Sequence, residues 1–89
     1  MEELLKVREE LDKLDNELVE LFTKRMSLSA EVARIKKEQN IPVLNQGREQ
    51  QILDRLTGDS DDDMKKYIIE LYTKIFDISR DYQKTLLEK

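Results

Sequence analysis

Apolar residues follow a seven-residue repeat through the first part of the chain. One column contains Leu4, Leu11, Leu18, Arg25 and Val32, and the other contains Val7, Leu14, Leu21, Leu28 and Ile35. This is the spacing of core positions on a packed helix, and the residues between them are mostly charged or polar. No Pro or Gly occurs within residues 1–40. The pattern predicts one long helix that ends near residues 38–40, just before Pro42.

Two further helices are predicted after this long one. A loop over residues 41–47 precedes an i, i+1, i+4 apolar pattern that predicts a short helix over 48–56. An Asp-rich joint over 57–63 then leads to a third helix over 64–87. One stripe of the third helix carries Met64, Ile68, Leu71, Tyr72, Ile75, Ser79, Tyr82, Gln83 and Leu86. The predicted fold class is all-α, with one long, one short and one long helix.

Arg25 is the polar exception in the first apolar column. A charge that loses its water inside a helical seam costs several kcal/mol unless it finds partners. The planar guanidinium suits a carboxylate or a phosphate, so this position predicts a bound anion. Two alternatives are a residue that sets the register of helix packing and a side chain that pairs with a nearby Glu.

Three more polar residues share helix faces in a way that fits a ligand. Lys36 lies eleven residues after Arg25, which is within about 20° of three full turns and about 16 Å along the axis. Their side chains could therefore hold opposite ends of a small dianion. Ser79 and Gln83 lie one turn apart on the third helix. The alternative for these two is hydrogen bonding to backbone or water.

Arg8 cannot join that ligand from the same helix. It lies seventeen residues before Arg25, which corresponds to about 25 Å along a straight helix. Arg8 can contribute only from a second protomer whose long helix runs antiparallel, and a two-fold dimer would provide this arrangement twice.

Composition limits the class of protein. The 89 residues predict a single domain over 1–89, and a chain of this length with 40% charged residues buries a thin core unless it self-associates. The net charge of −4, with no cluster of Lys and Arg, argues against nucleic-acid binding. No stretch is apolar enough to span a membrane. The charged amino-terminal sequence lacks the apolar region of a signal peptide, so we expect a cytoplasmic location.

The absence of Cys and His excludes several kinds of catalysis. Disulfides, thiolate chemistry, Ser-His-Asp triads and His-bound zinc all require residues that this chain lacks. The acidic run of Asp59, Asp61, Asp62 and Asp63 lacks the spacing of a calcium loop. We expect it to cap and charge the helix that follows. No metal and no cofactor are predicted.

The polar residues and their order resemble those of the all-helical chorismate mutases of the bacterial type, which often form the amino-terminal domain of bifunctional enzymes of phenylalanine or tyrosine synthesis. The resemblance covers nearly the whole chain. It rests on Arg8-Glu9, Leu14-Asp15, Lys24-Arg25-Met26, Val32-Ala33, Lys36, Pro42-Val43, Arg48-Glu49, Ser79 and Gln83. It implies an intertwined helical homodimer and a small-molecule substrate, chorismate, which is converted to prephenate.

The resemblance also implies a role for each matching residue. Arg25 and Arg48 of one subunit, with Arg8 of the partner subunit, would bind the two carboxylates of chorismate. Lys36 and Gln83 would face the ether oxygen whose bond to carbon breaks. A Gln donates without being protonated, so activity that does not require acid pH is expected.

Three further positions complete the implied site. Glu49 would accept a hydrogen bond from the ring hydroxyl, and Ser79 would assist in binding a carboxylate. Asn45 departs from the family pattern, which commonly has Asp at this position. A contact made by the backbone would survive that difference, whereas a contact that needs a carboxylate would not.

Two other functions stay open on the sequence alone. The isochorismate-pyruvate lyases resemble the same three-helix dimer and use a similar cationic pocket, although Glu49, Ser79 and the Lys24-Arg25-Met26 context are closer to the mutases. A non-catalytic helical dimerisation or regulatory module is the second alternative. The domain could also be joined to a partner domain in a longer protein.

Overall fold

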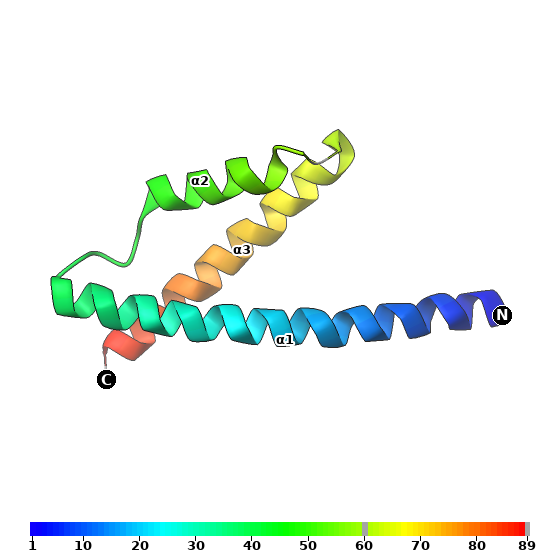
Figure 1. Ribbon diagram of the computed structural model, residues 1–89, viewed down its shortest axis with the longest axis horizontal. Coiled ribbons are helices and arrows are strands. Elements are labelled where there is room, and N and C mark those ends of the chain that lie inside the picture. The colour runs from blue at the N-terminus through cyan, green and yellow to red at the C-terminus, as the bar shows by residue number, and fades with distance from the viewer. Residues whose placement is uncertain (60, 89) are drawn as a thin grey trace.

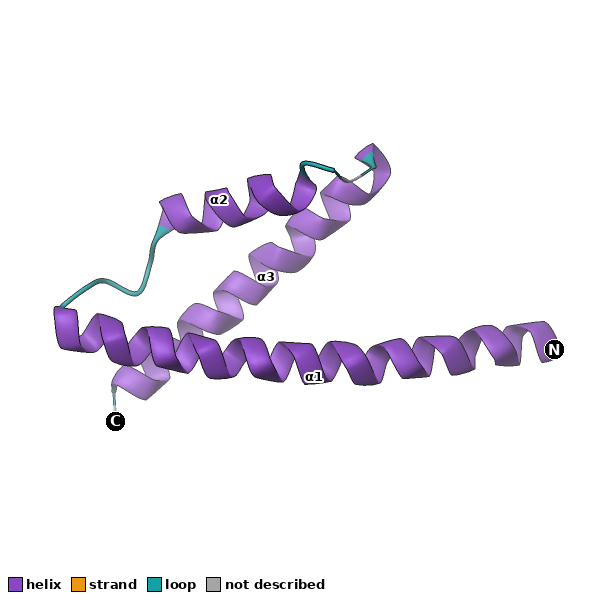
Figure 2. Cartoon of the chain, in the orientation of Figure 1, coloured by secondary structure: helices purple, strands orange, loops and turns teal. Residues whose placement is uncertain are grey.

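The computed structural model contains three helices, and the residues it describes are 1–59 and 61–88. The helices are α1 (Glu2–Gln39), α2 (Gln46–Thr57) and α3 (Asp62–Leu87). Figure 2 shows only helices and loops, and the described residues contain no strand. The predicted all-α class and helix order are confirmed. Ser60, within the predicted second joint, and Lys89, at the end of the predicted domain, lie outside the described residues.

The end of α1 lies where the sequence placed it. Asn40 adopts the left-handed conformation, with φ 57° and ψ 40°. Asn tolerates this conformation better than most residues because its short polar side chain can bond locally. The backbone N–H of Ile41 donates to the carbonyl of Lys36 at 2.8 Å, which satisfies one of the last carbonyls of the helix.

Both later helices begin two residues earlier than predicted. α2 begins at Gln46 because the Asn45 side chain accepts a hydrogen bond from the Arg48 backbone N–H at 3.0 Å, as an N-cap does. α3 begins at Asp62, where the Asp61 carbonyl accepts from the N–H groups of Met64 and Lys65. The Asp61 side chain makes no capping hydrogen bond, so the acidic run contributes charge to the first turn but no side-chain cap.

The three helices are arranged around α3. The molecule measures 55 × 30 × 15 Å, and α1 lies along its long axis. The helix α3 crosses the carboxyl-terminal half of α1 (Figure 1). α1 and α2 each pack against α3, and in the described residues they do not pack against one another. The space between α1 and α2 is therefore left for a pocket, with α3 as its floor.

Little apolar surface is buried within one chain. The buried apolar residues are Ala33, Ile52 and Phe76. Phe76 lies outside the predicted stripe, whereas Met64, Leu71 and Tyr82 of that stripe are exposed. Both heptad columns of α1 are also open to solvent; Leu18 is 60% exposed and Leu28 is 67% exposed. The amino-terminal half of α1 extends beyond the other helices (Figure 1), and its apolar side chains are exposed in the described part of the chain.

Neither α1 nor the other two helices of the described chain has a stretch long and apolar enough to cross a membrane.

Candidate active site

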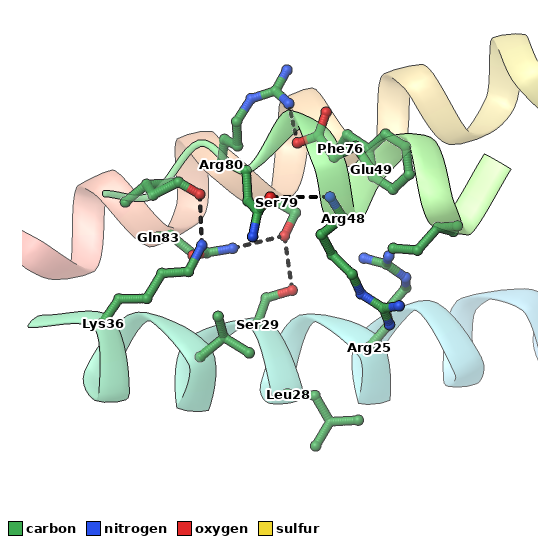
Figure 3. A pocket seen from close by; sticks show the side chains of 14 residues that line it. Arg25, Leu28, Ser29, Lys36, Arg48, Glu49, Phe76, Ser79, Arg80 and Gln83 are labelled. Atoms are coloured by element: carbon green, nitrogen blue, oxygen red, sulfur yellow. Dashed lines mark hydrogen bonds and ion pairs between the residues drawn. The ribbon is translucent and has the colours of Figure 1, made fainter. Parts of the chain in front are cut away.

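A pocket of about 310 Å³ lies between α1 and α2, with α3 beneath it. Volumes of a few hundred Å³ are typical of sites for small molecules. Residues from all three helices and from the loop after α1 line it: Arg25, Leu28, Ser29, Val32, Lys36, Val43, Asn45, Arg48, Glu49, Ile52, Phe76, Ser79, Arg80 and Gln83 (Figure 3).

Seven of the eight predicted site residues meet in this pocket, namely Arg25, Lys36, Asn45, Arg48, Glu49, Ser79 and Gln83. Arg8 does not. It is exposed near the amino-terminal end of α1, and its seventeen-residue separation from Arg25 corresponds to about 25 Å of helix. Within one chain the pocket therefore forms without Arg8.

Arg25 is held by aromatic rings. Its guanidinium carbon lies 5.7 Å from the centre of the Tyr72 ring and 5.9 Å from that of Phe76, and these rings meet edge to face. Such contacts attract a cation and orient the guanidinium plane. Arg25 makes no ion pair with the described residues, so the alternative in which it pairs with a nearby Glu is wrong. Its hydrogen-bond donors stay available to an anion.

Lys36 is tied to the loop that leads into α2. Its Nζ donates to the backbone carbonyl of Val43 at 2.7 Å, and the side chain is half-buried. An ammonium has three donors, so two remain for a ligand. The contact ties Val43, in the loop that leads to Asn45 and α2, to the carboxyl-terminal part of α1.

Arg48 lies in the first turn of α2, where the Asn45 cap fixes the backbone. Its Nη1 donates to the Gln51 side-chain oxygen at 2.8 Å, and the side chain is exposed at the mouth of the pocket. Because Gln51 is uncharged, the positive charge of Arg48 is not neutralised by this contact.

A buried chain of polar groups joins α1 to α3. The hydroxyl oxygens of Ser29 and Ser79 lie 2.8 Å apart, and Gln83 Nε2 donates to Ser79 Oγ at 3.2 Å. Gln83 is only 7% exposed, and its Oε1 has no hydrogen-bond partner among the described residues. Turning the amide by 180° would let Ser79 donate to Oε1 and would present the two N–H donors where Oε1 now lies. The pocket thus holds a neutral donor group with two hydrogen-bonding arrangements.

Glu49 is paired with an arginine from α3. Arg80 Nη1 donates to Glu49 Oε2, and Arg80 Nη2 donates to Asp77. The hydrogen bond to Glu49 is the main cause that raises the pKa of Arg80 above its ordinary value, and it outweighs the opposing effect of burial. The charges of Glu49 and Asp77 act in the same direction. Glu49 is therefore not an isolated negative charge in the pocket.

Ser29, Phe76 and Arg80 were not predicted as site residues. Ser29 carries a detectable signal, because it lies four residues after Arg25 and seven before Lys36, on the same side of α1. Phe76 falls one turn before Arg80 but outside the predicted stripe. Arg80 carries no periodic signal, and only the structure pairs it with Glu49.

The pocket is cationic on a chain of net negative charge. Among the described residues, four cations line it, Arg25, Lys36, Arg48 and Arg80, together with one carboxylate, that of Glu49. Ser and Gln side chains add neutral donors. Such a set can bind a small molecule with two carboxylates and stabilise negative charge that develops on an oxygen. Within the described residues, no group of three His, Cys, Asp or Glu side chains could hold a metal ion.

Comparisons with known proteins agree with this chemistry. The chorismate mutase of Methanocaldococcus jannaschii is 38% identical over 56 residues, which are 63% of this chain and 57% of that protein. The T-protein of Haemophilus influenzae is 41% identical over 49 residues, or 55% of this chain and 13% of that protein. A bifunctional chorismate mutase/prephenate dehydratase of Buchnera aphidicola is 38% identical over 88 residues, or 97% of this chain and 24% of that protein.

This chain thus spans just over half the length of the first relative and a quarter or less of the other two. No solved structure matches it. The family model of type II chorismate mutase matches residues 7–84, a range that includes the pocket residues and Arg8. The chain therefore belongs to the type II chorismate mutase family.

Proposed function

We propose that this protein converts chorismate to prephenate, as a step in aromatic amino acid biosynthesis. One observation carries the proposal. A single cavity of about 310 Å³ is lined by three cations from separate turns of helix, Arg25, Lys36 and Arg48. In Figure 3, Lys36 and Gln83 lie toward one end and Arg25 and Arg48 toward the other. This distribution fits a substrate with carboxylates and an ether oxygen at separate positions.

The reaction suits a site without nucleophiles. The rearrangement is intramolecular, since one carbon–oxygen bond breaks while one carbon–carbon bond forms and no atom enters or leaves. An enzyme can speed it by holding a compact substrate conformer and by placing donors where negative charge develops. In this proposal Lys36 and Gln83 donate to the ether oxygen. Arg25 and Arg48 bind the carboxylates.

The remaining pocket residues orient the substrate. Glu49 accepts a hydrogen bond from the ring hydroxyl, and Ser79 assists in binding a carboxylate. Asn45 holds the first turn of α2 by its capping bond, so it places Arg48 and Glu49. This role needs an oxygen acceptor and no negative charge, which accounts for Asn at a position that is commonly Asp in the family.

The active form in this proposal is a homodimer in which Arg8 of the partner subunit completes each pocket. The exposed heptad columns of α1 support it, because such a face buries its apolar area only against another helix. A second copy with its α1 antiparallel would bring an arginine from its amino-terminal half near Arg25. We also propose a cytoplasmic location. Relatives named as bifunctional enzymes support a fused partner domain in a longer protein.

The first test measures the loss of chorismate absorbance with identification of the product, using purified protein near neutral pH. Prephenate is the expected product. Release of pyruvate from isochorismate without turnover of chorismate would instead identify a lyase. Absence of both reactions from a folded, dimeric protein would leave a binding module and contradict the proposal.

The second test examines Arg8. Arg8→Ala and Arg25→Ala homodimers should each lose most activity, because each removes a charged contact from both sites. When the two variants are unfolded and refolded together, random assembly makes half of the dimers mixed, and each mixed dimer has one intact site. One quarter of all sites in the mixture are then intact, so the mixture should show about a quarter of the activity of an equal concentration of wild-type dimer. No recovery from mixed dimers would contradict a site shared between subunits.

A further inference from the structure

The pair formed by Arg80 and Glu49 differs from the other ion pairs of the described residues. It joins α2 to α3, whereas the others link residues three or four apart on one helix. Both side chains are 24% exposed, while the partners in the α1 pairs are more than half exposed. Water screens less exposed charges more weakly, so the charges of this pair act more strongly on neighbouring groups in the pocket.

The hydrogen bonds of Arg80 fix which part of Glu49 is free. Arg80 donates to Glu49 Oε2, and its second terminal nitrogen donates to Asp77. A planar guanidinium bound at two points has little freedom to rotate. Oε1 of Glu49 accepts no hydrogen bond from the described residues, so one carboxylate oxygen stays available within the pocket.

An unpaired Glu49 would create an electrostatic problem. Its negative charge lies in the same pocket that is proposed to bind a substrate with two carboxylates, and like charges at short range repel. A carboxylate that is paired with Arg80 keeps an acceptor oxygen but presents little net charge. The cation therefore allows an acidic side chain to serve in an anion-binding pocket.

We propose that Arg80 is a positioning residue that orients Glu49 and neutralises it toward the dianionic substrate, an inference that rests on the proposed function. Arg80 acts through Glu49, and Asp77 holds the second edge of its guanidinium. Glu49 Oε1 is then directed to the ring hydroxyl, and the substrate carboxylates are left to Arg25 and Arg48.

The test compares Arg80→Met with a matched control, Arg34→Met. Arg34 also bridges two carboxylates, Glu31 and Glu38, but it lies on the exposed face of α1 outside the pocket. Arg80→Met should raise KM for chorismate about tenfold and change kcat less than about threefold, because repulsion weakens ground state and transition state alike. Added salt should reduce the rise in KM by screening. Arg34→Met should leave both constants unchanged.

A double-mutant cycle separates positioning from direct binding. In a Glu49→Gln background no charge remains to be neutralised, so adding Arg80→Met should change KM less than about threefold. An equal tenfold rise in that background would show that Arg80 binds substrate itself and would overturn the proposal. Equal KM values for Arg80→Met and wild type would also overturn it.

Arg80→Lys provides a second test in case Arg80→Met does not fold. Lys retains the charge without the two-point geometry, so its KM should fall between those of wild type and Arg80→Met. A Lys variant with the full KM rise and native circular dichroism would contradict charge neutralisation. If wild-type protein makes no prephenate, the proposed function fails; if wild type is active and these variants match it, only the role of Arg80 fails.

Discussion

Lys36 is held in place by a hydrogen bond within the chain. Its bond to the Val43 carbonyl fixes the ammonium before substrate arrives, which lowers the cost of ordering a long side chain during the reaction. Lys36→Ala should lower kcat/KM by about 100- to 1,000-fold, as expected for the loss of a donor to developing charge. Steady-state kinetics with prephenate detection would measure this.

Lys37→Ala is the matched control, because Lys37 is the next residue of α1, is exposed and does not line the pocket. Its kinetics should equal those of wild type. A fall of less than about tenfold for Lys36→Ala would contradict a catalytic role for the ammonium.

Gln83 provides a pH-dependent test. The carboxyl group introduced by Gln83→Glu must be protonated to donate, and burial raises the pKa of such a group above about 4.3. Activity of this variant should be highest near about pH 5 and should fall as pH rises through about 6. Wild type should show no such fall. A wild-type rate that collapses over the same range would contradict the neutral amide as donor.

The sequence located most of the pocket but could not supply its internal contacts. Arg25, Lys36, Ser79 and Gln83 stand out because each interrupts or follows a helical period. Arg80 does not, since any exposed helix carries arginines at irregular positions. Its pairing with Glu49 depends on how α2 lies over α3, and residues that are 31 positions apart give no local sign of such a contact.

The start of α2 illustrates how one side chain defines an element. Asn45→Ala removes the acceptor for the Arg48 N–H and should lower the free energy of unfolding by about 1 kcal/mol. Urea denaturation at a fixed protein concentration would measure the change. Asn45→Asp should match or slightly exceed wild type, because a carboxylate also caps and favours the helix dipole. Equal loss in both variants would contradict the capping role.

The apolar periodicity of the sequence predicted that the three helices exist. It did not predict the residues at which α2 and α3 begin. The first turn of a helix faces solvent and shows no apolar repeat, so the predicted starts at Arg48 and Met64 fell after the true ones. The carboxyl end of α1 was predictable because Asn40 and Pro42 act locally. Caps that depend on one hydrogen bond, such as that of Asn45, are harder to place by pattern alone.

The association of two chains can be tested on the exposed columns of α1. Leu18→Asp places a charge on a face that the proposed dimer would bury, so the dissociation constant should rise at least about 100-fold. Sedimentation across a range of concentrations would measure this. Asn16→Asp adds the same charge outside both columns and should leave association unchanged. A fully active monomer would contradict the crossed-site arrangement.

The heptad pattern predicted that α1 is a packed helix. It did not identify which element packs against each half of α1. The carboxyl-terminal half of α1 has α3 as a neighbour, and Ser29 and Ala33 are buried there. Leu4 to Leu18 show the same period, and their side chains are exposed in the part of the chain that the structure describes. A periodic apolar face predicts that one side of a helix is buried. The same period arises whether the partner is another helix of the same chain or a helix of a second molecule.

The uninterrupted course of α1 makes its length a measure of the distance between the two proposed sites. One extra residue inserted between Arg8 and Arg25 would turn Arg8 by about 100° and move it about 1.5 Å, while every contact from Arg25 to Gln83 within the chain is kept. Seven extra residues would restore its direction but displace it by about 10 Å. Natural variants of this domain should therefore accept insertions in the loops and tolerate none in this segment.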